Sequence, residues 1–265
     1  MSLMRVVVYL GLLLPSPLWS AEISSFASGQ DLDPSMVRSG YEFLTPASQA
    51  LQDDDFENPG WLWVEQGRQR FVSEIEGLAC ASCHEMTDAT FASAAVRFPR
   101  WSEARRTLIN LEGQINECRE LRMDRAPYAL ESEEMLSMSA FVSHLARGQS
   151  SRVVLTDETR LFWQNGRDYF FRRKGQMNLA CSQCHDERWG KQLRGDIISQ
   201  GHPNGFPLYR YEWQSLGSLH RRLQDCDAGI RAEPQTLGSE IYLSVELYLA
   251  WRARGLILET PAIRR

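Results

Sequence analysis

The sequence lacks several features that would point to other classes of protein. Its 29 Lys and Arg residues are outnumbered by 34 Asp and Glu residues, and the formal net charge of −5 argues against nucleic acid as a partner. After the first 21 residues no apolar run is long enough to cross a membrane, so we expect no membrane span. No useful stretch alternates apolar and polar residues as a half-buried strand does. The apolar spacing is helical instead, which predicts a mainly α protein.

One short motif occurs twice. Residues 80–84 and 181–185 both read Cys-x-x-Cys-His, and the two copies are 101 residues apart. In this pentapeptide the thiols are spaced to bond covalently to the vinyl groups of haem, while the histidine reaches the iron from one side. A zinc site or a thioredoxin-like redox pair is the alternative, but neither requires a histidine after each cysteine pair. The motifs predict two covalently bound haem c groups, with thioether bonds from Cys80, Cys83, Cys181 and Cys184 and iron ligation by His84 and His185.

Residues 1–21 have the layout of a cleaved signal peptide. Arg5 supplies a positive charge, and residues 6–14 form an apolar run that is too short to span a bilayer. Pro15 then breaks the run before Ser20 and Ala21, near which we expect cleavage. The segment predicts export, and covalent haem attachment favours the bacterial periplasm.

Two related halves follow. The pattern Gly-Arg-x-x-Phe occurs at 67–71 before the first haem motif and at 166–170 before the second. Each half closes on a similar apolar helix, at 136–148 and at 243–255. We predict two fused cytochrome c-like domains behind an N-terminal arm, with the arm at 22–60, the first domain at 61–150 and the second domain at 151–265.

The arm matches nothing in the second half. It contains Ser, Pro and Gly residues and the acidic run 53–55, which together predict irregular or short helical structure. We interpret the acidic run as a solvated surface turn in preference to a metal site.

Each haem iron needs a second ligand or an open coordination position. Methionine, the second ligand in many electron carriers, is absent after Met177 and is therefore excluded for the second haem. The candidates downstream of the second motif are His202, His220 and Cys226. The first half still offers Met123, Met135 and Met138.

Two cysteines lie outside the haem motifs, at matching positions in the two halves. Apolar residues precede them at helical spacing, Leu108, Leu111 and Ile115 before Cys118 and Leu216, Leu219 and Leu223 before Cys226. In a helix this spacing puts each cysteine on the face that would pack on the haem, where a thiolate can ligate iron. We therefore predict axial ligation by Cys118 and Cys226. A Cys118–Cys226 disulfide and inert buried thiols are the alternatives.

The two halves differ one helical turn before these cysteines. Arg222 precedes Cys226 by four residues, whereas Gln114 holds the equivalent position before Cys118. A cation beside a thiol favours the thiolate and attracts an anionic substrate. We therefore place the working site at the second haem, with Cys226 and Arg222 as its catalytic residues. The same half contains further ionisable residues whose direction the sequence does not give, His220, Arg221, Lys191, Arg194 and Arg210.

The chain resembles the SoxA family, the larger subunit of the SoxAX cytochrome of bacterial sulfur oxidation. The resemblance rests on residues 38–44 (RSGYEFL), on residues 49–60 (QALQDDDFENPG), on both haem motifs, on Cys118 and on the pattern Arg222-x-x-x-Cys226. It covers nearly the whole chain after the signal peptide. Because the first haem motif and Cys118 are intact, the chain is similar to the dihaem type of the family.

This resemblance implies an activity. The family joins thiosulfate oxidatively to a cysteine on the flexible arm of a carrier protein, and two electrons leave; the activity is that of an L-cysteine S-thiosulfotransferase. The resemblance implies that Cys226 ligates the second haem and can carry an extra sulfur as a persulfide, and that Arg222 holds the thiosulfate. The implied partners are a small monohaem cytochrome c subunit (SoxX-like), a sulfur carrier protein (SoxYZ-like) and a soluble cytochrome c that accepts electrons.

Three other functions are open at this point. A thiosulfate dehydrogenase couples two thiosulfates to tetrathionate and also uses His/Cys ligation, but the SoxA-like segment at 38–60 argues against it. A dihaem electron carrier would have no substrate. A dihaem peroxidase needs one iron that opens readily to peroxide, which a thiolate at each haem disfavours.

Overall fold

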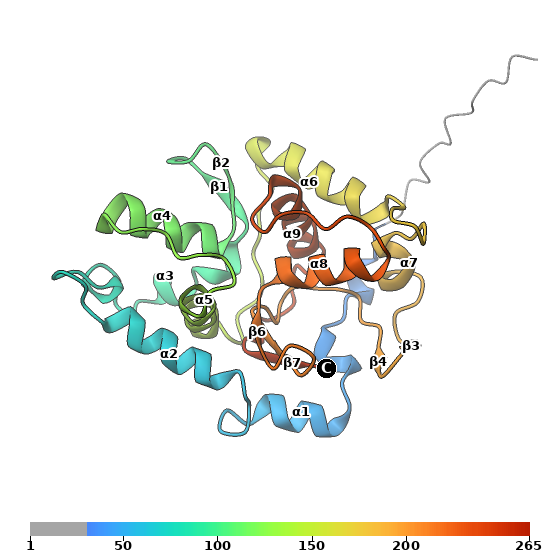
Figure 1. Ribbon diagram of the computed structural model, residues 1–265, viewed down its shortest axis with the longest axis horizontal. Helices are drawn as coiled ribbons and strands as arrows, with labels where there is room; N and C mark the ends of the chain where they lie inside the picture. Colours follow the sequence, from blue (N-terminus) through green and yellow to red (C-terminus); the bar gives the residue numbers. More distant parts are fainter. Residues whose placement is uncertain (1–30) are drawn as a thin grey trace, which may run out of the picture.

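The computed structural model describes residues 31–265, so the predicted signal peptide and the first residues of the arm lie outside the described residues. Helices dominate and the strands are few and short, which confirms the prediction of a mainly α fold (Figure 1). Within residues 31–265 no helix has both the length and the apolar character needed to cross a membrane.

The elements fall into three groups along the chain. The arm contains the 3₁₀ helices η1 (Pro34–Met36) and η2 (Gly40–Phe43) and the helix α1 (Pro46–Asp53). The first lobe contains α2 (Trp61–Val72), η3 (Cys80–Ser82), α3 (Ala89–Ala92), η4 (Ala95–Arg97), β1 (Arg100–Ser102), β2 (Thr107–Ile109), α4 (Leu111–Met123) and α5 (Glu133–Leu145). The second lobe contains α6 (Asp157–Phe171), α7 (Cys181–His185), β3 (Gln192–Leu193), β4 (Asp196–Ile197), β5 (Leu208–Arg210), β6 (Ser215–Gly217), α8 (Leu219–Gly229), α9 (Glu240–Arg252) and β7 (Ala262–Arg264).

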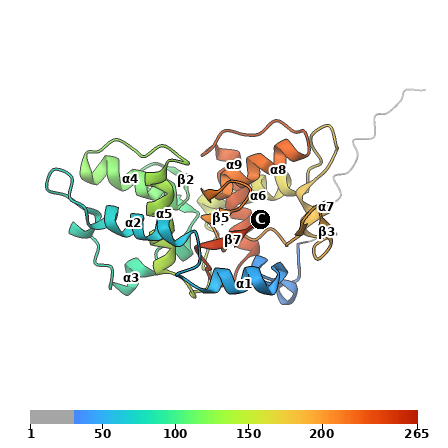
Figure 2. The same ribbon diagram turned by 60° about the horizontal axis from the view of Figure 1, so that its bottom comes forward.

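Each lobe is built around one pair of crossing helices. In the first lobe α2 packs on α5, and in the second lobe α6 packs on α9 (Figure 2). A glycine makes each close crossing possible, because a Cβ at Gly67 would collide with the carbonyl oxygen of Ser137. A Cβ at Gly166 would collide with the carbonyl oxygen of Ser244 in the same way. The glycine of the duplicated Gly-Arg-x-x-Phe pattern is therefore required by the packing of the helix pair.

A hairpin followed by a helix is also duplicated. β1 pairs antiparallel with β2 and leads into α4, and β5 pairs antiparallel with β6 and leads into α8. The strands and the first residues of the two helices are shifted by 108 residues. These strands were not expected, because runs of three residues are too short to show an alternating pattern. The expectation that Leu108 and Leu216 belong to the cysteine-bearing helices is wrong, since both lie on strands. Both are fully buried all the same.

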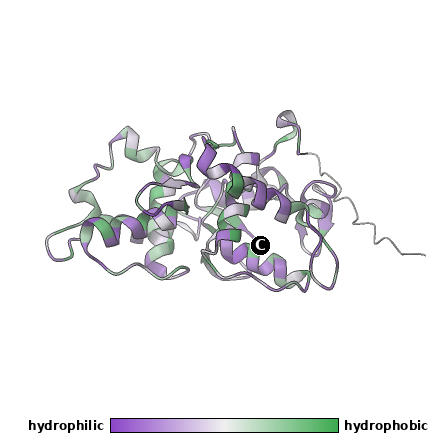
Figure 3. Cartoon of the chain, turned by 90° about the horizontal axis from the view of Figure 1, so that it is seen from above, coloured by the Kyte–Doolittle hydropathy of each residue, from purple (hydrophilic) through white to green (hydrophobic). Residues whose placement is uncertain are grey.

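Hydrophobic and hydrophilic residues alternate along the helices of both lobes (Figure 3), and each lobe contains its own cluster of buried apolar residues. In the first lobe Phe71 and Phe141 pack together with their ring centroids 5.3 Å apart. In the second lobe Phe170 and Tyr248 pack at the same centroid distance. The helices α5 and α9 are buried over most of their length, so they form the centre of each lobe.

The arm packs against the C-terminal end of the chain. The buried Asn58 side chain donates from Nδ2 to the carbonyl oxygens of Gln52 (3.1 Å) and Pro261 (2.9 Å). The Oε1 atom of Gln52 in turn accepts hydrogen bonds from Ile263 N (3.1 Å) and Arg264 Nη1 (2.9 Å). The strand β7, which contains these last two residues, pairs in parallel with β5 of the second lobe. The arm is therefore tied to the lobe that contains Cys226.

The acidic run of the arm forms contacts within the protein. Asp53 accepts a hydrogen bond from the Tyr41 hydroxyl (2.5 Å), Asp54 caps the turn at Phe56 N (2.9 Å), and Asp55 forms an ion pair with Arg147 (2.5 Å). The part of the chain that the structure describes holds no group of His, Cys, Asp and Glu residues suited to a metal ion. All three acidic side chains are exposed, and each contacts another part of the chain.

Candidate functional site

The second Cys-x-x-Cys-His motif forms the short helix α7. The Nδ1 atom of His185 lies 2.7 Å from the carbonyl oxygen of Ser199, which fixes the ring and leaves Nε2 as the nitrogen available to iron. Gly201 lies against the ring, since a Cβ there would be 3.0 Å from its Cγ and Nδ1 atoms. Burial lowers the pKa of His185 to about 4, and the charges of Arg252 and Arg222 act in the same direction. The imidazole is therefore neutral at pH 7, as a metal ligand must be.

The helix α8 brings Cys226 to this motif. Leu223 and Leu219, one and two turns before Cys226, belong to the same apolar cluster as Cys181. Burial raises the pKa of Cys181 to about 12, against the nearby charge of Lys174, and the proximity of Cys226 raises it further. Burial also raises the pKa of Cys184, and Cys226 again contributes. The structure therefore places the Cys226 thiol close to both cysteines of the second motif.

Arg222 is the cation of this site. It lies one turn before Cys226 on α8 and is partly buried, and within residues 31–265 its side chain makes no hydrogen bond or ion pair. Its charge contributes to the lowered pKa values of His185 and Arg210, after burial in both cases. Arg210 is buried on β5, and its Nε atom has no hydrogen-bond partner while Nη2 donates to Glu212 (3.1 Å). Arg210 thus lies near Arg222, and two guanidinium groups with unused donors form an environment suited to an oxyanion.

The first lobe repeats this arrangement with different residues. Burial raises the pKa of Cys80 and the proximity of Cys118 adds to the effect, so α4 presents Cys118 to the first motif. Gln114 occupies the place of Arg222, and its Nε2 atom donates to Cys118 Sγ (3.3 Å). His84 is exposed and stacks on Phe91, with ring centroids 4.6 Å apart. The first site therefore contains a neutral side chain beside its cysteine where the second site contains a cation.

These residue sets suit haem c. Each lobe offers two thiols, a histidine directly after them and a third cysteine on the facing helix, which is the donor set of a covalently held haem with one nitrogen and one sulfur axial ligand. The structure disfavours a Cys118–Cys226 disulfide, because the two cysteines are not paired and each lies beside the haem motif of its own lobe. Axial ligation by Cys118 and Cys226 stays a prediction.

Known proteins match this chain in sequence and in fold. A family model described as the SoxA/TsdA cytochrome c domain matches residues 66–150. The L-cysteine S-thiosulfotransferase subunit SoxA of Pseudaminobacter salicylatoxidans is 35% identical over 86% of this chain and 80% of that protein. The chain belongs to the SoxA family. The SoxA subunit of Rhodovulum sulfidophilum is 34% identical over the same shares of the two chains. The crystal structure of SoxXA from P. pantotrophus has a TM-score of 0.81 at 30% identity and covers 86% of this chain and 87% of that chain.

Membership of the SoxA family confirms the resemblance inferred from the sequence, and the cytochrome c domain makes this SoxA chain a haem c protein. The reserve histidine candidates for the second iron fit less well than Cys226. His220 uses both ring nitrogens, since Nδ1 accepts from Gly238 N (3.0 Å) and Nε2 lies 3.0 Å from Glu246 Oε2. His202 is buried, which lowers its pKa to about 3, and its Nε2 atom lies 3.1 Å from Gln200 Oε1. Lys191 and Arg194 are exposed.

Several residues that support this SoxA site were missed by sequence reasoning. Asp227, directly after Cys226, is buried and accepts hydrogen bonds from the hydroxyls of Tyr169 (2.6 Å) and Tyr242 (2.8 Å). Its other oxygen forms an ion pair with Lys174 Nζ (2.6 Å). Burial and these hydrogen bonds raise the pKa values of both tyrosines, which therefore stay protonated donors. The network holds the backbone beside Cys226 in place.

A second support lies behind the histidine. Arg252 on α9 is buried and forms an ion pair with Asp186 Oδ1 (2.5 Å), the residue that follows His185. The Arg252 guanidinium also lies 4.4 Å from the centroid of the Phe170 ring. Nothing in the local sequence connects Arg252 with the motif or Lys174 with Asp227, because the residues of each pair are about 50 to 70 positions apart and meet only through packing.

Proposed function

We propose that this protein is the SoxA subunit of an L-cysteine S-thiosulfotransferase and that the second lobe contains its active site. The observation that carries the proposal is the pair formed by Cys226 and Arg222, a free thiol and a guanidinium without a partner among the described residues, one helical turn apart beside the second Cys-x-x-Cys-His motif. The names of the curated relatives support the activity.

The residues suit the two halves of the reaction. Thiosulfate is a dianion with several oxygens, and the fork of donors on Arg222 matches such a group, with Arg210 close enough to add charge. The sulfur of Cys226, as thiolate or persulfide, is both a nucleophile and a leaving group for sulfur exchange. In the net reaction a carrier thiol and thiosulfate form one S–S bond and release one proton and two electrons. Haem, when bound, supplies the acceptor for those electrons.

We propose two haem c groups, one in each lobe. The first would be held by Cys80 and Cys83 with His84 and Cys118 as axial ligands. The second would be held by Cys181 and Cys184 with His185 and Cys226 as axial ligands. The thiol clusters of both lobes support this assignment, as does the Ser199 carbonyl that orients His185. Gln114 beside Cys118 supports a first haem without a substrate site.

The partners follow from the same proposal. A small monohaem cytochrome c subunit of the SoxX type is supported by the likeness of this chain to the SoxXA crystal structure. A cysteine-tipped carrier of the SoxYZ type would deliver the thiol, and a soluble cytochrome c would remove electrons. We place the protein in the periplasm, after cleavage of the signal peptide at 1–21, with an arm at 22–60 and domains at 61–150 and 151–265.

The intact mass of the haem-loaded protein tests the proposal. We expect the mass of two haems plus a sulfur-sized adduct that mild reductant removes. Cys226→Ala should lack the adduct and should transfer no thiosulfate to the carrier protein. Cys118→Ala is the matched comparison, and its adduct should persist because the variant leaves Cys226 and Arg222 intact. An adduct that survives in Cys226→Ala, or transfer by that variant, would contradict the proposal.

A requirement for the carrier protein distinguishes the proposed activity from its main alternative, the oxidation of free thiosulfate to tetrathionate. The family model that matches residues 66–150 is named for both SoxA and TsdA, so oxidation of free thiosulfate needs its own test. We expect reduction of the electron acceptor only when carrier protein and thiosulfate are both present. Reduction with thiosulfate alone, accompanied by tetrathionate, would indicate a thiosulfate dehydrogenase instead.

A further inference from the structure

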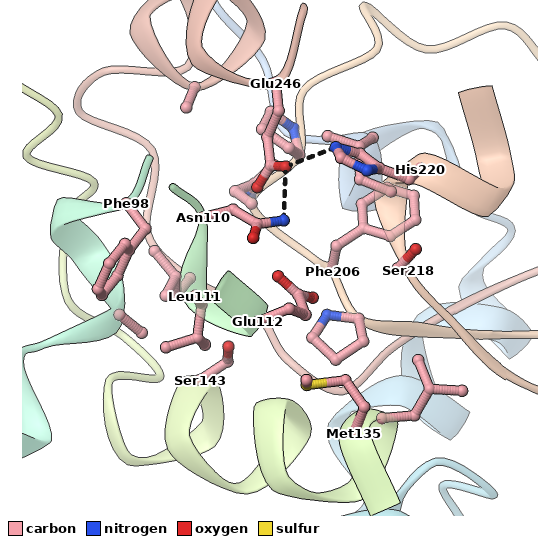
Figure 4. A pocket seen from close by; sticks show the side chains of 18 of the residues that line it. Phe98, Asn110, Leu111, Glu112, Met135, Ser143, Phe206, Ser218, His220 and Glu246 are labelled. Atoms are coloured by element: carbon pink, nitrogen blue, oxygen red, sulfur yellow. Dashed lines mark hydrogen bonds and ion pairs between the residues drawn. The ribbon is translucent and has the colours of Figure 1, made fainter. Parts of the chain in front are cut away.

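Two residues at equivalent positions of the two lobes meet between them. Glu112 on α4 and His220 on α8 are 108 residues apart, the offset that also relates the hairpins and Cys118 to Cys226. They border a cavity of about 90 Å³ that is lined by residues of both lobes (Figure 4). The duplication has thus brought the first turns of the two cysteine-bearing helices face to face, with an acid on one and a histidine on the other.

A network of contacts surrounds this pair. The His220 ring lies 3.0 Å from Glu246 Oε2, and the same oxygen accepts a hydrogen bond from Asn110 Nδ2 (3.0 Å). Asn110 is the residue that caps α4, so Glu246 on α9 is joined to the start of α4 and the start of α8 together. Figure 4 shows Glu112 pointing into the space between Asn110 and Met135. Within the described chain the Glu112 carboxylate has no side-chain hydrogen bond.

A third carboxylate faces the cavity from the segment before α5. Glu131 Oε1 accepts a hydrogen bond from Ser218 N (3.1 Å), the residue that caps α8, and its buried Oε2 lies 4.0 Å from Arg221 Nη1. Five charged or titratable groups therefore surround the cavity. They are Glu112 on α4, Glu131 before α5, His220 and Arg221 on α8, and Glu246 on α9.

The charges of this cluster do not balance without an added proton. Three carboxylates share a largely buried space with one imidazole, while Arg221 contacts only Glu131 and lies at the margin. Unpaired like charges in such a space are strongly unfavourable. Burial raises the pKa of Glu112 to about 7, and Glu246 adds to this shift. Burial disfavours the charged form of His220, but Glu246, Glu112 and Glu131 outweigh it and raise its pKa.

We propose that this cavity is a proton-binding site, shared by Glu112, Glu246 and His220, that joins the two lobes in a pH-dependent manner. With the proton bound, the cluster links the first turns of α4 and α8. Without it, two or more carboxylates repel one another across the contact between the lobes. Each helix runs six residues, about 9 Å, from this contact to its cysteine, so the proton acts on the mutual position of both cysteine-bearing helices.

The sign of the pH effect on stability follows from the difference in proton binding between the folded and the unfolded state. The pKa of Glu112 is raised from 4.5 in a solvated chain to about 7 in the folded protein. Between these values the folded state holds a proton that the unfolded state has lost, so stability falls as pH rises through this window. His220 adds its Nε2–H to the cluster, because Gly238 N donates to Nδ1 (3.0 Å) and Nε2 lies 3.0 Å from Glu246 Oε2.

The Glu112→Gln variant tests the proposal in the haem-loaded protein. We expect the wild-type unfolding temperature to fall between about pH 5 and pH 8 with a slope equivalent to about one proton. The variant should lose most of this slope and should be more stable than the wild type at the upper end, because the amide cannot ionise. Glu103→Gln, at a side chain that is 77% exposed, is the matched control and should keep the wild-type slope. An unchanged slope in Glu112→Gln would overturn the proposal.

A second measurement does not depend on unfolding. A buried protonated carboxyl group gives a carbonyl-stretch band in the infrared difference spectrum of a pH jump, and this band should be present at about pH 6 in the wild type and in Glu103→Gln. It should be missing from Glu112→Gln. A spectrum without the band in the wild type, or with the same band in Glu112→Gln, would show that the cluster does not hold the shared proton.

Discussion

The equivalent helices α4 and α8 carry different residues around their cysteines, Cys118 and Cys226. Beside Cys118 the side chain one turn earlier is Gln114, which donates a hydrogen bond to the sulfur and carries no charge. Beside Cys226 the equivalent side chain is Arg222, which has no partner of its own among the described residues. The residue after the cysteine differs as well, because Asp227 anchors the backbone to two tyrosines. At the scale of single residues, Arg222 and Asp227 distinguish the second site from the first, where Gln114 stands in the place of Arg222.

The Arg222→Gln variant gives the second lobe the glutamine that the first lobe has one turn before its cysteine. We expect kcat/KM for thiosulfate transfer to fall about 10- to 100-fold, since a hydrogen bond to a charged group contributes roughly 1.5 to 3 kcal/mol. Steady-state kinetics with the carrier protein and varied thiosulfate would measure this. The haem absorbance should be unchanged, and Arg194→Gln, at an exposed hairpin residue, should behave as the wild type. If the variant were as active as the wild type, Arg222 would not be a thiosulfate-binding residue.

Helix pairs set the geometry in which these residues act. In each lobe a glycine lets two helices cross with their backbones in contact, and the haem motif follows the first helix of each pair. The glycine is the one residue type without a Cβ to hold the helices apart. The crossing therefore determines where the chain enters the motif, and a shift in it would move the histidine relative to the facing cysteine.

Adding a methyl group at either crossing should be costly. We expect Gly67→Ala and Gly166→Ala each to lower the free energy of unfolding by about 1 to 3 kcal/mol, because the added Cβ meets backbone that cannot move aside. Chemical denaturation of the haem-loaded protein would measure the loss. Gly229→Ala in α8 is the control, since a Cβ there meets nothing within 4 Å. Equal stability of all three variants would show that the crossings can relax.

The arm joins parts of the molecule that are far apart in the sequence. Asn58 contacts the end of α1 and the C-terminal segment. Gln52 contacts β7, which pairs with β5, the strand that contains Arg210. The ion pair between Asp55 and Arg147 ties the same arm to the end of the first lobe. The arm thus contacts both lobes, and it supplies the family segment recognised in the sequence.

Removing the central contact of the arm should weaken the whole protein. Asn58→Ala leaves the carbonyl oxygens of Gln52 and Pro261 without their donor, and we expect a loss of about 2 to 3 kcal/mol in the free energy of unfolding. For a protein of this size that corresponds to a decrease of roughly 5 to 10 °C in the thermal midpoint. Glu57→Ala, at the exposed neighbouring residue, should change neither quantity appreciably. An unchanged midpoint for Asn58→Ala would mean that the arm is not needed for stability.

The sequence by itself determined the mainly α fold and the family, and it predicted the covalent haem chemistry and the four-residue spacing of Arg222 and Cys226. These are local features, because the bonds of a pentapeptide and the face of a helix depend only on residues a few positions apart. The short hairpins escaped prediction because three residues hold too little periodicity, and that is why Leu108 and Leu216 were assigned to helices. The tertiary structure alone decided that Ser199 orients His185, that Lys174 reaches Asp227 and that Glu112 meets His220. These contacts join residues that are distant or unrelated in the local sequence, and only the packing of the chain brings them together.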